Sequence, residues 1–246
     1  MTEKTALVTG ASRGIGKATA MALAADGYRV LVHYGTSRDK AEAVVAAIRE
    51  AGGSADAVGA DLAEPDAAHA LAAEVTRLCG GALHALVLNA AIMPGSDIET
   101  CTPEVLDRIY HINLRAPFFL LQQLTPVLAE GASVVFLSSV TARRGVWATA
   151  GYGALKHSLE SLVRRAAVVL GERWVRVNVV APATTASETV APYVESGPGR
   201  EMTLAGQALK RIAQPDDIAD VIAFLCSNKA RWITGALIPV DGGTLL

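Results

Sequence analysis

The fold of this chain is decided by the stretch Thr5-Ala6-Leu7-Val8-Thr9-Gly10-Ala11-Ser12-Arg13-Gly14-Ile15-Gly16, in which a short apolar run leads into a glycine-rich turn. Residues 5–9 predict a buried β-strand, and the alanine-rich residues 14–26, which end before Gly27, predict a helix. Glycines let the backbone approach a pyrophosphate closely, while the N-terminus of a helix offers free N–H donors. The stretch therefore predicts a strand, a phosphate-binding loop and a helix in that order.

The same alternation of short apolar runs and longer alanine-rich segments continues along the chain. Further strands are predicted at residues 29–33, 55–58, 85–88, 133–138, 175–180 and 237–240, and further helices at residues 39–51, 65–78, from 103 onward, 152–170 and 215–226. Continuous apolar strands separated by helices are typical of a parallel sheet that is covered on both faces. We therefore expect a doubly wound, Rossmann-type α/β fold with a parallel sheet of about seven strands and helices on both faces.

The chain is expected to form one domain over residues 1–246, because no linker rich in proline, glycine or serine divides it. The longest segment without a strand signal is about 182–211. Long loops in compact domains are often functional lids. We expect this segment to be a substrate-binding loop or lid within the single domain.

Composition excludes several classes of partner. The 246 residues include 22 Lys and Arg and 24 Asp and Glu, and this formal net charge of −2 predicts no nucleic-acid partner. No run of about 18 apolar residues is present, which predicts no membrane-spanning helix. The three cysteines, Cys79, Cys101 and Cys226, lack CxxC spacing, and the histidines lack HExxH spacing. We therefore expect no metal site and a reducing, cytoplasmic location.

The spacing of the glycines points to a family. From Thr9 to Gly16 the pattern is T-G-x-x-x-G-x-G, which resembles the classical branch of the short-chain dehydrogenase/reductase family. The length of the chain fits that branch, and the resemblance covers essentially the whole chain. The resemblance assigns nucleotide contacts in this loop to Gly10, Ser12, Arg13, Gly14, Ile15 and Gly16.

The end of the second strand predicts which nucleotide is preferred. No Asp or Glu occurs from Tyr28 to Arg38, whereas members of the family that prefer NAD have an acidic residue here for the ribose hydroxyls. Arg13, Ser37 and Arg38 could instead bind a 2′-phosphate, although Arg38 could also be a solvated charge at the start of a helix. With Tyr34 as a further contact, we predict NADP(H) rather than NAD(H) as the preferred cofactor.

Other cofactor positions follow from the resemblance alone. Asp61 matches a position that contacts the adenine in the family, although it could instead cap a helix. In the usual family pattern Asn-Asn-Ala-Gly, this chain has Leu88 for the first Asn and Ala91 for the Gly. After the sixth strand, Ala183 replaces a common Gly and Ser187 a common Thr. The resemblance assigns cofactor contacts to Asp61, Leu62, Asn89, Ala90, Tyr152, Lys156, Pro182, Thr185 and Ser187.

A tyrosine and a lysine stand four residues apart, at Tyr152 and Lys156. On a helix this spacing places both on one face. A free tyrosine titrates near about 10, and a neighbouring ammonium favours the phenolate and lowers that pKa. The pair therefore predicts that Tyr152 acts as a general acid and base for a carbonyl and its alcohol.

The family resemblance completes a catalytic tetrad. Ser139 lies at the end of a predicted strand, 13 positions before Tyr152, whereas the spacing of Ser138 is off by one. The tetrad is Asn113, Ser139, Tyr152 and Lys156. It implies that Ser139 binds the substrate oxygen and that Lys156 depresses the pKa of the tyrosine and binds the nicotinamide ribose. Asn113 is implied to hold a water that links Lys156 to solvent.

These residues predict an NADP(H)-dependent oxidoreductase that interconverts a ketone and a secondary alcohol. The nearest resemblance is to 3-oxoacyl-carrier-protein reductases. Arg173 matches one basic position of that group, but residues 128–131 contain no basic residue. A non-catalytic member that senses NADP or acts as a scaffold is the alternative from another class. By resemblance we expect a homotetramer, or a homodimer, through the helices that contain Asn113 and Tyr152.

Several other signals have structural explanations. Each histidine, including His33, is expected to be structural, and Trp174 is expected to pack. The basic pair Arg143-Arg144 predicts a solvated or interface pair. Met93, Val140 and Trp147 flank the expected site and could line an apolar pocket, and Trp147 could equally lie at a subunit contact.

Overall fold

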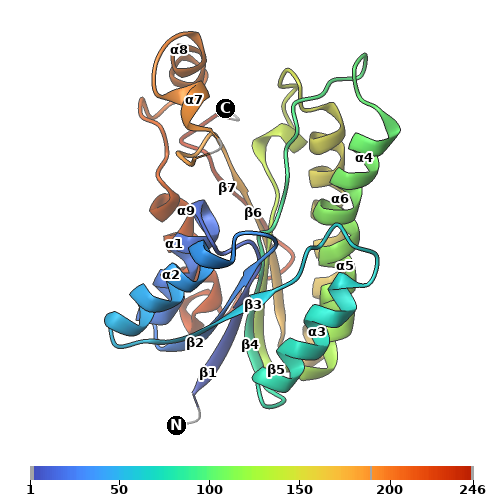
Figure 1. Ribbon diagram of the computed structural model, residues 1–246, viewed down its shortest axis with the longest axis vertical. Coiled ribbons are helices and arrows are strands. Elements are labelled where there is room, and N and C mark those ends of the chain that lie inside the picture. The colour runs from blue at the N-terminus through green and yellow to red at the C-terminus, as the bar shows by residue number, and fades with distance from the viewer. Residues whose placement is uncertain (1–2, 189, 245–246) are drawn as a thin grey trace.

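A parallel sheet forms the centre of the computed structural model, which describes residues 3–188 and 190–244 (Figure 1). Its strands are β1 Lys4–Val8, β2 Tyr28–Tyr34, β3 Ser54–Gly59, β4 Leu83–Leu88, β5 Leu128–Leu137, β6 Arg176–Pro182 and β7 Leu237–Val240. Within the described residues, these seven strands pair in the order β3-β2-β1-β4-β5-β6-β7. The direction of winding reverses between β1 and β4, where sheets of this kind bind ligands beyond the carboxyl ends of the strands.

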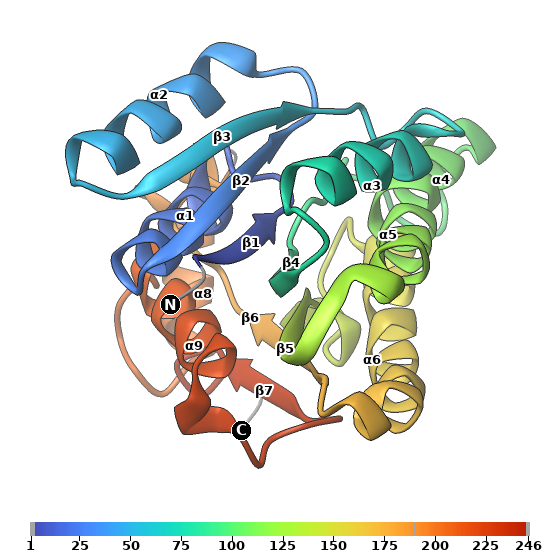
Figure 2. The same cartoon turned by 90° about the horizontal axis from the view of Figure 1, so that it is seen from below.

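Helices cover both faces of this sheet. They are α1 Gly14–Ala25, α2 Arg38–Glu50, α3 Ala67–Leu78, α4 Pro103–Tyr110, α5 Ala116–Leu124, α6 Ala150–Leu170, α7 Ala191–Val194, α8 Pro198–Ala205 and α9 Pro215–Cys226. A π-helical turn, η1 His111–Arg115, joins α4 to α5, and 3-10 turns lie at η2 Thr125–Val127, η3 Val140–Ala142, η4 Gly171–Arg173 and η5 Asn228–Ala230. Helices α1, α2 and α9 lie on one face and α3 to α6 on the other (Figure 2). The predicted Rossmann-type fold is confirmed.

The continuous apolar strands arise because both faces of the sheet are buried. Successive residues of a strand point to opposite faces. Leu86 therefore belongs to the core under α3, α5 and α6, and Val87 to the core under α1, α2 and α9. Both are fully buried. In the described part of the chain, no helix combines the length and apolar character that a bilayer crossing requires.

Strand β5 begins earlier than the sequence predicts. The expected strand was 133–138, whereas β5 starts at Leu128, which pairs with Leu83. The pairing then shifts, so that Ala85 pairs with Ser133. Glu130 and Gly131, which lie in the irregular part, are exposed. Because these two residues are not apolar, the apolar pattern did not reveal the first residues of β5.

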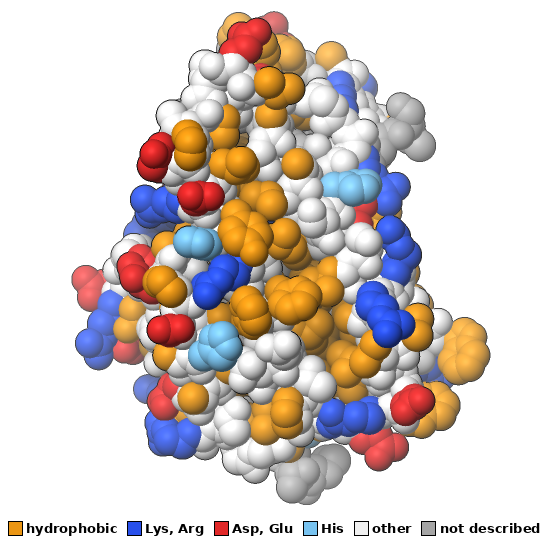
Figure 3. All heavy atoms as spheres, turned by 90° about the vertical axis from the view of Figure 1, so that its right-hand side faces the viewer, with side chains coloured by type: hydrophobic (Ala, Val, Ile, Leu, Met, Phe, Trp, Pro, Cys, Tyr) orange, Lys and Arg blue, Asp and Glu red, His pale blue; other side chains and the backbone are white. Residues whose placement is uncertain are grey.

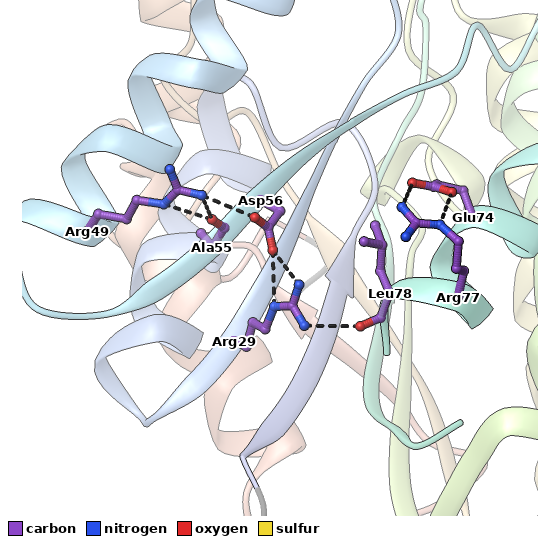
Figure 4. A network of polar contacts seen from close by, with 7 residues as sticks. All are labelled: Arg29, Arg49, Ala55, Asp56, Glu74, Arg77 and Leu78. Carbon is purple, nitrogen blue, oxygen red and sulfur yellow. Dashed lines mark hydrogen bonds and ion pairs between the residues drawn. The ribbon is translucent and has the colours of Figure 1, made fainter. Parts of the chain in front are cut away.

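An ion-pair network joins β2, β3, α2 and α3 near the amino ends of the strands (Figure 4). The guanidinium of Arg29 donates to Asp56 Oδ2 from Nε at 3.0 Å and from Nη2 at 2.6 Å, and to Leu78 O at 3.0 Å. Arg49 Nη2 lies 3.1 Å from Asp56 Oδ1. Because the carboxyl ends of the strands lie at the opposite edge, this network holds the fold rather than a ligand.

Segment 182–211 contains α7 and α8, which stand beyond the carboxyl ends of the strands (Figure 1). Its last part is fastened to the C-terminal residues, because Leu209 N donates to Gly242 O at 2.8 Å. An ion pair between Lys40 of α2 and Glu188 fastens its first part. The segment therefore has the position that a lid over the strand ends requires.

Candidate active site

The glycine-rich loop between β1 and α1 fits against the end of β4 with no space for side chains. A Cβ on Gly10 would lie 2.9 Å from Ala90 Cα, and Gly10 has a φ of +63°. A Cβ on Gly16 would lie 2.6 Å from Asn89 Nδ2 and 2.9 Å from Ala11 Cα. Contacts this short are overpacked, so both positions require glycine. The loop is therefore packed directly against the end of β4 at these two positions.

The N-terminus of α1 is open for an anion. Its N-cap residue, Arg13, makes no capping hydrogen bond with its side chain, and the first turn contains no acidic residue. Free N–H groups and the helix dipole favour negative charge at such an end. Gly14 would place a Cβ 3.7 Å from Ser187 Cβ, so the segment after β6 lies against this helix end.

Asn89 and Thr9 hold the loop to β4. Asn89 Nδ2 donates to Thr9 O at 2.8 Å and to Gly10 O at 3.1 Å. Thr9 Oγ1 accepts from Asn89 N at 2.9 Å and from Ala90 N at 3.0 Å. The structure thus brings Asn89 and Ala90 to the predicted cofactor loop. The Asn89 amide orients the backbone of that loop.

Ser139, Tyr152 and Lys156 meet beyond the carboxyl end of β5. Ser139 follows β5, and its hydroxyl is near enough to the Tyr152 phenol to favour the lower pKa of that group. Lys156 Nζ lies 5.6 Å from the centroid of the Tyr152 ring and donates to Leu137 O at 2.6 Å. The predicted shared face of Tyr152 and Lys156 on α6 is confirmed by this contact.

The pKa of Tyr152 departs from the ordinary value in the direction opposite to our expectation. Burial raises the pKa of the Tyr152 phenol to about 12, and the nearby Ser139 hydroxyl opposes this only in part. Burial also lowers the pKa of the Lys156 ammonium to about 7. Desolvation disfavours the charged form of each group. Burial, and not the neighbouring lysine, therefore determines the direction of the Tyr152 pKa in this arrangement.

Asn113 lies in the π-helical turn η1 and is fully buried. Its Nδ2 donates to Ile92 O at 2.8 Å, and its Oδ1 accepts from Ile92 N at 2.9 Å. The side chain therefore fixes the segment after β4 to the helices.

Comparison with known proteins identifies the family of this chain. The family model described as enoyl-(acyl carrier protein) reductase matches residues 10–244. The chain is 38% identical over 242 residues to the 3-oxoacyl-[acyl-carrier-protein] reductase FabG of Staphylococcus aureus, covering 98% of this chain and 97% of that protein. The chain belongs to the short-chain dehydrogenase/reductase family of oxidoreductases.

Two further relatives are reductases named for their ketone chemistry or substrate. Versicolorin reductase 1 of Aspergillus parasiticus is 37% identical over 251 residues, covering 98% of this chain and 95% of that protein. The crystal structure of the angucycline C-6 ketoreductase LanV with bound NADP superposes with a TM-score of 0.93 at 39% identity, covering 98% of this chain and 95% of that one. This short-chain dehydrogenase/reductase therefore has ketoreductases and NADP-bound structures among its neighbours.

In this short-chain dehydrogenase/reductase, β2 contains no Asp or Glu, and basic side chains follow it in the chain. Arg13 is exposed, and Arg38, the first residue of α2, lies 3.8 Å from Glu42. The Ser37 side chain makes no capping hydrogen bond with α2. Lys40 lowers the pKa of Glu188, with smaller contributions from Arg13 and Lys17. These basic side chains therefore gather beside the phosphate loop.

The other predicted cofactor residues differ in what they can offer. Ser12 is partly buried, and Ile15 and Tyr34 each pack, partly buried, against the core under α1, α2 and α9. Asp61 is exposed, and its Oδ1 accepts from Ala63 N at 3.1 Å. It starts a turn and does not cap α3, which begins only at Ala67. The Leu62 side chain lies in the core, which leaves only its backbone for a ligand.

The segment after β6 adopts its course without strain. Pro182 ends β6, and Thr185 is buried with its hydroxyl donating to Ala183 O at 3.0 Å. Ser187 Oγ accepts from Val190 N at 3.3 Å. Among the described residues other than glycine, positive φ occurs only at Ala148 and Trp174. Ala183 therefore replaces the usual glycine at no conformational cost.

Trp174, Arg143 and Arg173 have surroundings that the sequence did not predict. Trp174, expected to pack, is 64% exposed and has a φ of +57°. Arg143, expected to belong to a solvated or interface pair, forms an ion pair with buried Glu160 at 2.8 Å. Arg173 donates to Thr125 O at 2.7 Å and to Leu128 O, so its guanidinium fastens the start of β5. None of these contacts is visible in the local sequence.

The mouth of the site is formed by two loops that hold each other. Asp97 Oδ2 accepts from Ala148 N at 3.0 Å, and Ser96 N donates to Ala148 O at 3.1 Å. Ala148 has a φ of +60°, and its neighbour Trp147 is 83% exposed. Met93 is also exposed, whereas Val140 is buried.

Within the described residues, no group of three or more His, Cys, Asp or Glu could hold a metal ion.

His33 is a residue of this site that sequence reasoning missed. It lies near the end of β2, where its Nδ1 accepts from Gly10 N at 3.0 Å and its Nε2 lies 3.0 Å from Ala60 O. Because Nδ1 accepts a hydrogen bond, Nε2 must carry the proton and donate it. The neutral ring therefore joins the glycine-rich loop to the end of β3. Its place at the carboxyl end of the second strand was the available signal.

Acid should weaken this link. Burial lowers the pKa of His33 from 6.5 to about 4, so the unfolded chain binds the extra proton first. The contribution of neutral His33 to the free energy of unfolding should be complete above about pH 6.5 and should decrease as the pH drops from there toward 4. In His33→Gln, we expect a flatter pH dependence of Tm over this range and weaker NADPH binding, measured by thermal melts and fluorescence titration.

The exposed His69 supplies the control. We expect His69→Gln to keep both the wild-type pH dependence of Tm and the wild-type Kd for NADPH. If His33→Gln matched wild type in both, the imidazole would have no part in ordering the loop.

Proposed function

We propose that the protein is an NADP(H)-dependent ketoreductase that interconverts a ketone and a secondary alcohol. The observation that carries this proposal is that Ser139, Tyr152 and Lys156 come together at the same edge of the sheet as the glycine-rich loop. The ketoreductase LanV with bound NADP supports both the reaction and the cofactor. The residues fit a dinucleotide, since the glycine-rich loop leads into the N-terminus of α1, whose first turn carries no side-chain cap and no acidic residue.

In the proposed reaction, the chain positions a carbonyl oxygen and gives it a proton. A nicotinamide cofactor held at this edge of the sheet would supply the hydride for the carbonyl carbon, or would accept it in the reverse direction. The Ser139 hydroxyl donates to the substrate oxygen and orients it, and the Tyr152 phenol transfers its proton to that oxygen. Because its pKa is about 12, the phenol is in the acid form that reduction requires at neutral pH. Lys156 would hold the ribose and return a proton to Tyr152.

The test is ketone-dependent oxidation of NADPH by the purified protein, followed at 340 nm over a panel of ketones and alcohols. Turnover of any ketone would support the proposal. It would also eliminate the alternative of a non-catalytic member that senses NADP or serves as a scaffold. Absence of turnover across the panel with both cofactors would leave that alternative as the better explanation.

We expect a clear preference for NADPH over NADH. The 2′-phosphate would meet Arg13, Ser37 and Arg38, where β2 offers no carboxylate, and charge-assisted bonds to arginine are strong. Discrimination of about 10- to 100-fold in kcat/KM corresponds to about 1.4–3 kcal/mol for such contacts. Steady-state kinetics with both cofactors measure it. Equal values, or a preference for NADH, would contradict the assignment.

Arg38 and Arg13 can be separated by single variants. If both bind the phosphate, Arg13→Ala and Arg38→Ala each reduce the preference for NADPH, while kcat/KM with NADH stays near wild type. If Arg38 is only a solvated charge beside Glu42, Arg38→Ala leaves the preference unchanged. Arg49, an exposed arginine at the other end of α2 that bonds Asp56, is the matched control.

A carrier-bound substrate is the narrower candidate within this function. The relative named FabG favours a 3-oxoacyl-carrier-protein reductase. Against it, Arg173, the one basic residue that matches that group, is engaged by backbone carbonyls. Substrate choice is assigned to the lid, residues 182–211. Comparing a carrier-bound with a free 3-oxo ester distinguishes the two cases.

The proposed assembly is a homotetramer, or a homodimer, built on the α4 to α6 face. Apolar side chains gather over the middle of this side of the molecule (Figure 3). Those on its helices that are at least 40% exposed include Leu106, Tyr110, Phe118, Val168 and Val169. Large exposed apolar patches mark interaction sites. A monomer at micromolar concentration in light scattering would contradict this assembly. A cytoplasmic location stays a prediction.

A further inference from the structure

A carboxylate is buried beside the catalytic residues, one helical turn beyond Lys156 on α6. The side chain of Glu160 is only 1% exposed, although glutamate is almost never fully buried unless it is paired. Its Oε1 accepts from Ser138 Oγ at 3.0 Å, and its Oε2 from Arg143 Nε at 2.9 Å. Arg143 Nη2 lies 2.8 Å from the same Oε2. The carboxylate is therefore hydrogen-bonded by one arginine and one hydroxyl, and His157 Nδ1 of the same helix lies 3.7 Å from Oε2.

These partners lie on the two sides of Ser139. Ser138 directly precedes it, and Arg143 follows the 3-10 turn η3 that Ser139 caps. The Ser138 hydroxyl is also 3.2 Å from Lys156 O, and Ser138 N donates to Val180 O at 2.8 Å. Glu160 thus ties both ends of the turn that carries Ser139 to the helix that carries Tyr152 and Lys156.

The turn has few other means of holding its place against α6. The hydrogen bonds that Ser139 Oγ accepts come from Thr141 N at 3.2 Å and Thr141 Oγ1 at 3.0 Å. These bonds lie inside the turn and move with it. The turn packs closely, because a Cβ on Gly153 would lie 2.6 Å from Thr141 O. Outside the turn, His157 Nδ1 lies 3.1 Å from Ala142 O.

Stability alone is a weak reason for a buried ion pair. Removing two charges from water costs about as much as their attraction returns, so apolar replacements are often as stable or more so. A pair in this place does, however, fix geometry. A displacement of about 1 Å at a reacting group can lower a rate by about 100-fold. The Ser139–Tyr152 contact is the geometry that this pair can control.

We propose that Glu160 and Arg143 are positioning residues that set Ser139 against Tyr152 and thereby govern the rate of proton transfer. The inference rests on the proposed ketoreductase function. The Arg143 side chain reaches the carboxylate from the loop, and the carboxylate in turn holds Ser138. Neither side chain needs to touch the substrate or the nucleotide, so binding of NADPH should be independent of the pair.

The test compares Glu160→Gln and Arg143→Met with wild type. We expect kcat for ketone reduction to fall about 10- to 100-fold in each, while KM and Kd for NADPH change less than about threefold. Arg143→Lys, which keeps a cation for the buried carboxylate, should recover part of kcat. Because the two residues act as one unit, the double variant Glu160→Gln/Arg143→Met should lose no more than the worse single variant.

Asp56→Asn is the matched control. It removes a carboxylate from an arginine pair of similar length at the amino ends of the strands (Figure 4). We expect it to lower Tm without changing kcat. If Glu160→Gln lowers Tm in the same way and leaves kcat within twofold of wild type, the pair only stabilises the fold and the inference is wrong.

Hydrogen exchange separates this inference from the proposed function. Amides of residues 139–149 should exchange faster in Glu160→Gln than in wild type, and at the wild-type rate in Asp56→Asn. If the wild-type protein reduces no ketone, the proposed function fails, and exchange still decides whether Glu160 holds the turn. Unchanged exchange over 139–149 in Glu160→Gln would overturn the positioning role whatever the turnover.

Discussion

Replacing Tyr152 by phenylalanine is expected to lower kcat for ketone reduction by about 100- to 10,000-fold, the range that one general acid contributes. The substitution removes the hydroxyl that lies near Ser139 but keeps the ring that lies beside Lys156. The apolar volume at this point of α6 is preserved, so the Kd for NADPH should change less than about threefold. Single-turnover reduction of a ketone and fluorescence titration of NADPH measure the two quantities.

Tyr28 provides a control of the same chemistry at another place. Burial raises its pKa to about 12, as for Tyr152, and its hydroxyl donates to Cys226 O at 3.0 Å in the core. Tyr28→Phe removes a buried hydrogen bond, which is worth about 0.5–1.5 kcal/mol to stability, and should leave kcat unchanged. If Tyr152→Phe kept more than a tenth of the wild-type kcat, another group would have to donate the proton.

The order of the elements and the place of the cofactor loop could be predicted because local sequence determines them. In a sheet covered on both faces, each strand is a continuous apolar run, and neighbours such as Leu86 and Val87 serve opposite cores. Ser139 could be placed for a similar reason. A residue that follows a parallel strand lies at the edge where ligands bind, and α6 then brings Tyr152 to it.

The direction of the Tyr152 pKa could not be predicted, because it depends on burial by residues far apart in the sequence. Spacing puts Lys156 near the phenol, but it does not show that Lys156 is itself desolvated, with a pKa of about 7. An unpaired buried ammonium loses charge before it can stabilise a phenolate. The spacing therefore predicted that the two residues are neighbours, but not that burial determines the pKa of each.

Polar residues with distant partners were also beyond the reach of sequence patterns. His33 has the sequence neighbours of an ordinary strand residue, and its role appears only when Gly10 and Ala60 come to either side of it. From its sequence neighbours Glu160 would be interpreted as a solvated helix residue, and only the structure shows that Arg143 hydrogen-bonds its carboxylate. The prediction for Trp174 was wrong in the opposite sense, because its apolar ring predicts packing but is 64% exposed.

Gly16→Ala is expected to weaken NADPH binding by about 10- to 100-fold, which corresponds to the 1–3 kcal/mol that overpacking costs. The new Cβ would lie 2.6 Å from Asn89 Nδ2 and 2.9 Å from Ala11 Cα, and it would clash with the Gly10 carbonyl oxygen. Two of these three atoms belong to the backbone, so the loop or the start of α1 must move. The N–H groups of α1 then no longer face the phosphates. Calorimetric titration with NADPH measures the loss.

Gly171→Ala is the matched control, because a Cβ there meets no atom within 4 Å, and its Kd for NADPH should equal that of wild type. Asn89→Ala keeps the result interpretable if Gly16→Ala folds poorly. It removes the bonds to Thr9 O and Gly10 O without adding an atom, so we expect a smaller loss of affinity. Combining it with Gly16→Ala relieves only the clash with the amide, and the backbone clashes should keep affinity low. Wild-type binding by a folded Gly16→Ala protein would show that the nucleotide does not depend on this loop.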